Sequence, residues 1–184
     1  MELVVPGLEH VDSYVDARRS GFAWGLLGGE AAIADALREL AADPGRWLQL
    51  LQDDDPVGRT ITLPDGSAVP RLPQFTRWMW DGAFAGVITF RWQPGSDELP
   101  PHVLGHIGYG VVESRRRRGY ATQALRDILV LPRNLGLSQV QITADPDNIA
   151  SQRVILNNGG RCLGTSPRPE AQGGAPITRF VIDL

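Results

Sequence analysis

One segment of this chain restricts the possible folds most strongly, because a strand, a basic glycine turn and a helix follow one another without a break. The apolar run His106–Val112 has the composition of a buried strand. It leads into Arg115-Arg-Arg-Arg-Gly-Tyr-Ala-Thr122, and a helical spacing of apolar residues begins at Ala121. A helix N-terminus presents unpaired N–H groups and a partial positive charge. The segment is therefore suited to hold a phosphate or pyrophosphate group.

Length and charge bound the class of protein. The 184 residues suit one domain, 1–184, with a sizeable core. The net charge of −3 disfavours a general affinity for nucleic acid, so the basic turn is a local feature. All 18 basic residues are arginine, which excludes a lysine nucleophile, a Schiff base and a P-loop lysine.

Cysteine and histidine are scarce. The single cysteine, Cys162, excludes an intrachain disulfide and is expected to be a buried small hydrophobe. With three histidines, the usual zinc spacings are absent, and we expect no metal. The chain has neither a run of 18 apolar residues nor a basic-then-apolar N-terminus. We therefore expect a cytoplasmic protein with no membrane partner.

The order of the predicted elements indicates a mixed α+β fold. Apolar spacing predicts helices over 8–22, 30–42, 46–52, 119–130 and 149–157. Alternation and turn signals predict strands or hairpins over 2–5, 60–69, 75–92, 105–112, 138–143, 162–164 and 177–182. Pro132 is expected to stop or kink a helix. This order favours a central, mostly antiparallel twisted sheet with helices on both faces.

Motifs in the second half of the chain resemble the GNAT acetyltransferase superfamily. Arg116-Arg-Arg-Gly-Tyr-Ala121 resembles its Arg/Gln-x-x-Gly-x-Gly/Ala turn, and the strand before it resembles the family's fourth strand. Asn148-Ile-Ala-Ser151, followed by Asn157-Asn-Gly-Gly160, resembles its Asn-x-x-Ser helix and closing turn. The resemblance covers 105–160, which it implies is an acetyl-CoA-binding core in a GNAT-like fold. The N-terminal part would then carry the acceptor side.

The resemblance also implies a role for each motif residue. Main-chain groups of the basic turn would bind the pyrophosphate of coenzyme A, and those at the strand end would hold the pantetheine arm. The Asn-x-x-Ser helix would contact the cosubstrate from the other side. The residues implied are Val111, Val112, Arg116, Arg117, Arg118, Gly119, Tyr120, Ala121, Thr122, Asn148 and Ser151. The implied activity is direct transfer of an acetyl group from acetyl-CoA to a primary amine of a small molecule or peptide.

The proton transfers of this reaction need further side chains. A protonated amine must lose a proton before it attacks, so a general base is expected. The candidates are His106, Glu113 and Asp145, although a strand histidine is more often structural. Many relatives have a proton-donating tyrosine at the position of Ile155 in this chain. Tyr109, Tyr120 or water would have to replace it.

Other functions stay open at this stage. The missing tyrosine and the uncertain base are also consistent with a non-catalytic acyl-CoA-binding or sensing module. The arginine run by itself suits a phosphate-binding nucleic-acid module, which the net charge disfavours. A homodimer through an exposed sheet edge is a further possibility. Five tryptophans are candidates for an acceptor pocket, although core packing is favoured: Trp24, Trp47, Trp78, Trp80 and Trp92.

Overall fold

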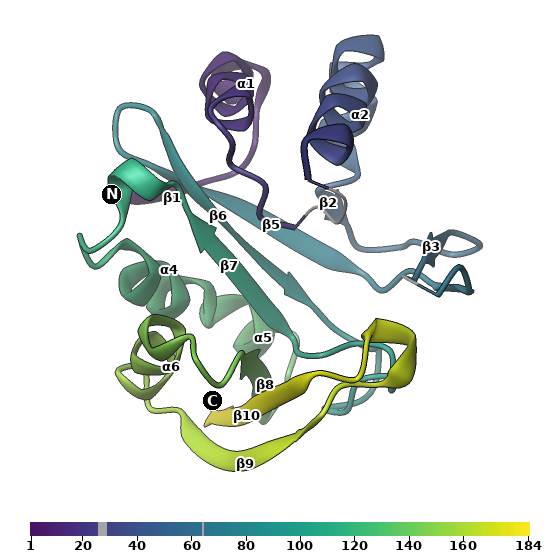
Figure 1. The fold of residues 1–184 in the computed structure, drawn as a ribbon, viewed down its shortest axis with the longest axis vertical. Helices are drawn as coiled ribbons and strands as arrows, with labels where there is room; N and C mark the ends of the chain where they lie inside the picture. The colour runs from purple at the N-terminus through teal and green to yellow at the C-terminus, as the bar shows by residue number, and fades with distance from the viewer. Residues whose placement is uncertain (26–28, 64) are drawn as a thin grey trace.

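The computed structural model describes residues 1–25, 29–63 and 65–184 (Figure 1). Its strands are β1 (Glu2–Val4), β2 (Gln52–Asp53), β3 (Thr60–Thr62), β4 (Ala68–Pro70), β5 (Gln74–Trp80), β6 (Phe84–Arg91), β7 (Ile107–Val111), β8 (Gln139–Ala144), β9 (Arg161–Pro167) and β10 (Pro176–Asp183). Its helices are α1 (Val11–Arg19), α2 (Gly29–Ala42), α3 (Pro44–Gln49), α4 (Tyr120–Ile128), α5 (Val130–Asn134) and α6 (Ile149–Leu156). Short 3₁₀ turns are η1 (Leu8–His10), η2 (Glu113–Arg115) and η3 (Glu170–Gln172).

The strands form two main sheets. The larger has the order β1-β5-β6-β7, with β2 also paired to β5, and the smaller has the order β8-β10-β9. β3 and β4 form a separate hairpin. The pairings within these sheets are antiparallel. The mixed α+β fold with a mostly antiparallel sheet is therefore confirmed.

Helices cover both faces of the larger sheet, as predicted (Figure 1). Successive residues of β6 point to opposite faces, so Val87 and Ile88 enter different cores. On the first face, α1 packs through Tyr14, whose ring stacks on Trp78 at 4.8 Å. On the second face, α4 buries Leu125 in the cluster that contains Ile88. The larger sheet thus separates an N-terminal layer of helices from a C-terminal one.

His106 marks the place where the larger sheet meets the smaller one. Its N–H donates to the carbonyl of Gln141 at 2.7 Å, and its Nδ1 accepts from the Gln141 N–H at 2.9 Å. The imidazole therefore accepts the hydrogen bond from the Gln141 N–H that a main-chain carbonyl would accept in a regular pair of strands. Beyond this point β7 continues in the larger sheet, paired with β6, while β8 pairs with β10 in the smaller sheet.

Pro132 limits the helix that the sequence predicts over 119–130. A proline ring clashes with the carbonyl four residues earlier, which here belongs to Ile128. α4 ends at that residue, and α5 contains the proline as its third residue. The expected stop is confirmed, and its position follows from the proline ring.

Other boundaries differ from the predictions. The helix expected from Leu8 begins as the 3₁₀ turn η1 and becomes α-helical only at Val11. The two closing strands are longer than expected, because β9 and β10 pair along most of their length. Burial of Cys162 is wrong: the residue is exposed, since β9 is the outer strand of its sheet.

Candidate active site

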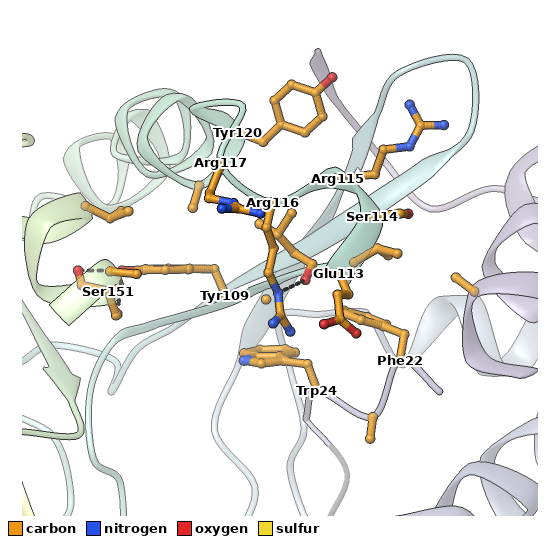
Figure 2. Close-up of a pocket in the computed structure, with 18 of the residues that line it drawn as sticks. Phe22, Trp24, Tyr109, Glu113, Ser114, Arg115, Arg116, Arg117, Tyr120 and Ser151 are labelled. Carbon is orange, nitrogen blue, oxygen red and sulfur yellow. Dashed lines mark hydrogen bonds between the residues drawn. The ribbon is translucent and has the colours of Figure 1, made fainter. Parts of the chain in front are cut away.

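A cavity of about 1120 Å³ lies between the end of β7, the first turns of α4 and α6, and the segment that follows α1 (Figure 2). Most of the residues implied by the motifs line it. They are Val111, Val112, Arg116, Arg117, Gly119, Tyr120, Ala121, Thr122, Asn148 and Ser151, together with the proposed catalytic residues Tyr109 and Glu113. The structure thus brings together two motifs that lie about thirty residues apart in the sequence.

Three predicted residues do not line the cavity. Arg118 turns back along η2, where its guanidinium donates to the carbonyl of Ser114 at 3.4 Å. Asp145 is exposed and forms an ion pair with Arg168. His106 is completely buried at the meeting point of the two sheets. Its position is that of a structural residue and leaves it out of reach of a substrate in this cavity.

The basic turn presents its main-chain N–H groups to the cavity. Arg117 and Gly119 both have positive φ, at 61° and 79°, and Gly119 is the N-cap of α4. Alternating left- and right-handed backbone directs successive N–H groups to one side and forms an anion-binding concavity. Within the described parts of the chain, no hydrogen-bond acceptor pairs with the N–H groups of 117–122. The turn therefore offers a row of donors and a helix N-terminus at one place.

Asp81, in the β5–β6 turn, fixes this arrangement from outside. Its Oδ2 accepts from Arg115 at 2.9 Å and from the hydroxyl of Tyr120. The Tyr120 hydrogen bond, with help from the Arg115 charge, lowers the pKa of Asp81 below its ordinary value. Tyr120 therefore directs its hydroxyl away from the cavity, as Figure 2 shows, and is not placed to protonate a leaving group there.

Two charged side chains of opposite sign extend over the cavity at the strand end (Figure 2). Arg116 donates through Nε to the carbonyl of Val111 at 3.3 Å. Glu113 is the one carboxylate among the described residues that line the cavity. The site therefore combines a strongly basic turn with a single acidic group beside the end of β7.

Tyr109, Asn148 and Ser151 form a hydrogen-bonded group on the opposite wall. The Asn148 side chain caps α6 by accepting from the Ser151 N–H at 3.0 Å. The Ser151 Oγ lies 2.8 Å from the Tyr109 hydroxyl, which also donates to the Ser151 carbonyl at 3.2 Å. Burial raises the pKa of Tyr109 to about 12, partly opposed by the Ser151 hydrogen bond. The phenol is therefore protonated at neutral pH and available as a donor.

Burial likewise explains the state of His106. It lowers the pKa of this imidazole to about 4, and the nearby Asp97 only partly opposes the effect. The ring is therefore neutral at pH 7, as its acceptor role at Nδ1 requires.

Ile155 is fully buried, where many relatives have a tyrosine. It belongs to the same core cluster as Leu125 of α4. A hydroxyl is therefore absent from this position, whereas Tyr109 on β7 and Ser151 on α6 both line the cavity with their hydroxyls hydrogen-bonded to each other.

The sequence analysis placed the acceptor side in the N-terminal part and Trp24 among the candidates for an acceptor pocket, but it did not predict which segment lines the cavity. Residues 20–24 and Ala17 line it from the segment after α1, and Phe22 and Trp24 supply the largest side chains. A signal was present in the sequence: Gly108 and Gly110 interrupt a strand without any turn. Glycine inside a strand often marks a close approach by another group, and here that group is Trp24.

The comparisons with known proteins decide the family. The family model described as Acetyltransferase (GNAT) domain matches residues 30–161, which is more than half of the chain. The chain belongs to this GNAT acetyltransferase family. It is accordingly an acyltransferase, and the resemblance seen in the sequence motifs is confirmed.

Solved structures agree in fold at low sequence identity. RimL, a ribosomal L7/L12 alpha-N-protein acetyltransferase in complex with coenzyme A, matches at TM-score 0.64 and 16% identity, over 99% of this chain and 93% of that one. Mycobacterium smegmatis RimJ with CoA-disulfide matches at 0.63 and 18%, over 99% and 81%. The microcin C7 self-immunity acetyltransferase MccE, with acetyl-CoA and AMP, matches at 0.58 and 14%, over 99% and 91%. No curated protein matches the chain by sequence.

No described helix is long and apolar enough to cross a membrane. Nor does this part of the GNAT chain contain a group of three or more His, Cys, Asp or Glu side chains that could hold a metal ion.

Proposed function

We propose that this GNAT protein transfers an acetyl group from acetyl-CoA directly to a primary amine of a small molecule or peptide. The observation that carries the proposal is the row of N–H groups over 117–122, which have no acceptor among the described residues and belong to a turn that lines the cavity beside the end of β7. Amide donors and a helix N-terminus suit a pyrophosphate better than a neutral ligand. The solved relatives with bound coenzyme A or acetyl-CoA support the same donor.

The remaining donor contacts follow from the cavity lining. The main chain of Val111 and Val112 would bind the pantetheine arm and hold the thioester carbonyl near the strand end. Asn148 and Ser151 would approach it from α6, while the arginines of the turn would add formal charge around the phosphates. These roles rest on position in the cavity and on the motifs.

Glu113 is the residue that we propose for the acceptor amine. An ordinary alkylammonium has a pKa of ~10.4, so its deprotonation at pH 7 costs roughly 4.6 kcal/mol. A carboxylate at the cavity wall attracts the ammonium ion and accepts its proton, directly or through water. The neutral amine then attacks the thioester carbon, which forms the C–N bond and breaks the C–S bond.

The departing thiolate needs a proton, for which we propose Ser151. Ser151 lines the cavity, and its hydroxyl is hydrogen-bonded to Tyr109, whose pKa is raised to about 12. Ser151 would give its proton to the sulfur and take the phenolic proton of Tyr109, and the phenolate would regain through water the proton that Glu113 removed from the amine. This pair would replace the donor that is missing at Ile155.

The test combines binding with turnover. Coenzyme A should raise the melting temperature, because a ligand that binds the native state stabilises it. Acetyl-CoA with a panel of primary amines should then release free thiol and yield the acetylated amine. Ser151→Ala should lower kcat by about 100-fold or more, as expected for loss of a positioned proton donor.

The outcomes separate the competing functions. Absence of any shift at millimolar coenzyme A would reject the donor assignment. Binding without thiol release across the panel would instead favour the non-catalytic acyl-CoA-binding module.

A further inference from the structure

Trp24 lies flat against the strand that borders the candidate active site. A Cβ built on Gly110 would fall 2.3 Å from Cγ and 2.6 Å from Cδ1 of the indole, and one built on Gly108 would fall 3.1 Å from Cζ2. The ring therefore runs along β7 from Gly110 toward Gly108, so close to Gly110 that a Cβ there would overlap it, while a Cβ on Gly108 would only make a tight contact. Neither glycine has a positive φ. At Gly110 it is therefore the missing side chain, and not the backbone conformation, that the structure requires.

A buried arginine holds the main-chain segment that carries the Trp24 indole. Arg18 is only 6% exposed, and its Nη1 donates to the carbonyls of Phe22 at 2.6 Å and of Trp24 at 3.0 Å. Its Nε donates to the Tyr14 hydroxyl at 2.8 Å. The guanidinium also lies over the rings of Tyr14 and Phe22, at 5.0 and 5.1 Å from their centres. The segment that carries Trp24 is thus fastened to the C-terminal end of α1.

The location of the indole relates it to the acyl group. Trp24 lines the same cavity as Gly110, Val111 and Val112, on the N-terminal side of the sheet (Figure 2). In the proposed function, Val111 and Val112 hold the thioester carbonyl. The carbon chain beyond that carbonyl would then extend toward Trp24 rather than into open space.

We infer that Trp24 forms the end wall of the acyl site and restricts the donor to the shortest acyl groups, with Arg18 as the residue that positions it. This inference rests on the proposed function and extends it to the choice of acyl donor. An acyl chain longer than acetyl has to displace an indole that packs on the strand and whose main chain is held by hydrogen bonds from Arg18 to the carbonyls of Phe22 and Trp24.

The test measures binding of coenzyme A, acetyl-CoA and butyryl-CoA by calorimetry, so it needs no acceptor. A closed apolar pocket discriminates one methylene by about 10- to 200-fold. The wild-type protein should therefore bind butyryl-CoA at least tenfold more weakly than acetyl-CoA. Trp24→Ala should abolish this difference and leave the affinity for coenzyme A itself within about twofold, since the amide turn is unchanged.

Two variants complete the design. Trp24→Phe retains a flat but shorter ring and should give an intermediate ratio of the affinities for acetyl-CoA and butyryl-CoA. This variant provides the test if Trp24→Ala does not fold. Trp47→Ala removes an aromatic side chain from the same core cluster without touching the cavity, and should keep the wild-type ratio.

Two results would overturn the inference while leaving the proposed function standing. One is equal affinity of the wild-type protein for acetyl- and butyryl-CoA. The other is an unchanged ratio in Trp24→Ala. Failure of all three ligands to bind would instead reject the proposed function, and the inference with it.

Discussion

The two sides of the cavity are built in different ways. The side that we propose for the donor consists mainly of main-chain groups from two short stretches, 109–122 and 148–154, whose shape is set by backbone conformation. The side that we propose for the acceptor and for the end of the acyl group consists of Ala17 and residues 20–24, whose two large side chains, Phe22 and Trp24, lie on a segment held by one buried arginine. A site made of backbone leaves a motif in the sequence, because glycines and caps are needed at fixed positions. A site made of side chains leaves almost none.

The largest expected effect lies on the donor side, at Gly119. Valine is a strong outlier at its φ of 79° and would distort the turn that orients the N–H groups. Coenzyme A at 100 times its Kd should stabilise the wild-type protein by about 2.7 kcal/mol, and Gly119→Val should lose this stabilisation. Gly136→Val is the matched control, since Gly136 has a φ of 77° and similarly open surroundings but lies far from the cavity. An equal loss in both variants would mean that general destabilisation, not the turn, is responsible.

The second effect concerns His106, at the meeting point of the two sheets. Its pKa is 6.5 ordinarily and about 4 in the folded protein, so the unfolded chain binds more protons between these values. Its contribution to stability is therefore complete above pH ~6.5 and falls as the pH drops toward ~4, by about 3 kcal/mol in all. His106→Asn retains a side-chain acceptor for Gln141 and does not titrate. Urea unfolding at pH 7 and 4.5 should show a smaller loss in the variant, and identical losses would contradict the structural role.

A third experiment loosens the acceptor side alone. Arg18→Met removes the donor that serves Tyr14 and the carbonyls of Phe22 and Trp24. The free energy of unfolding should fall by about 2 kcal/mol, because hydrogen bonds from a buried charged group are lost. The coenzyme A shift should nevertheless match that of the wild-type protein. A smaller rise in melting temperature with coenzyme A would show that the two sides of the cavity are energetically coupled, and it would contradict their independence.

The smallest expected effect is that of Asp81→Asn. Asp81 anchors Arg115 and Tyr120, but its carboxylate is only half-buried, and ion pairs that reach solvent contribute little. The Kd for coenzyme A should rise by about two- to fivefold. Asp35→Asn, which breaks the exposed pair with Arg38 on α2, should leave the Kd unchanged. A tenfold or larger effect at Asp81 would instead assign the anchor a dominant part in shaping the turn.

The geometry of the side proposed for the donor was predictable because its determinants are local in sequence. The basic turn, Gly119 and the Asn148 cap each act within one turn of helix, so their spacing reveals them. The fold class was predictable for a related reason, since alternation and turn residues report on strands and hairpins one at a time.

The features that sequence reasoning missed depend on contacts between distant segments. Trp24 meets Gly110 across more than eighty residues, and His106 pairs with Gln141 on another strand. In the sequence, a strand histidine that faces a substrate cannot be told from one whose ring replaces a main-chain hydrogen-bond acceptor between two strands. Exposure of Cys162 likewise depends on β9 being the outer strand of its sheet, which no local pattern encodes.

Amide hydrogen exchange with and without coenzyme A tests the central claim most directly, because it reports on main-chain N–H groups segment by segment. If the donor site is built from the amides of the basic turn, coenzyme A should slow exchange in a peptide covering 117–122, while a peptide covering 17–24 stays unchanged. Unchanged exchange over 117–122 at saturating coenzyme A, or protection confined to 17–24, would contradict the assignment of the donor site.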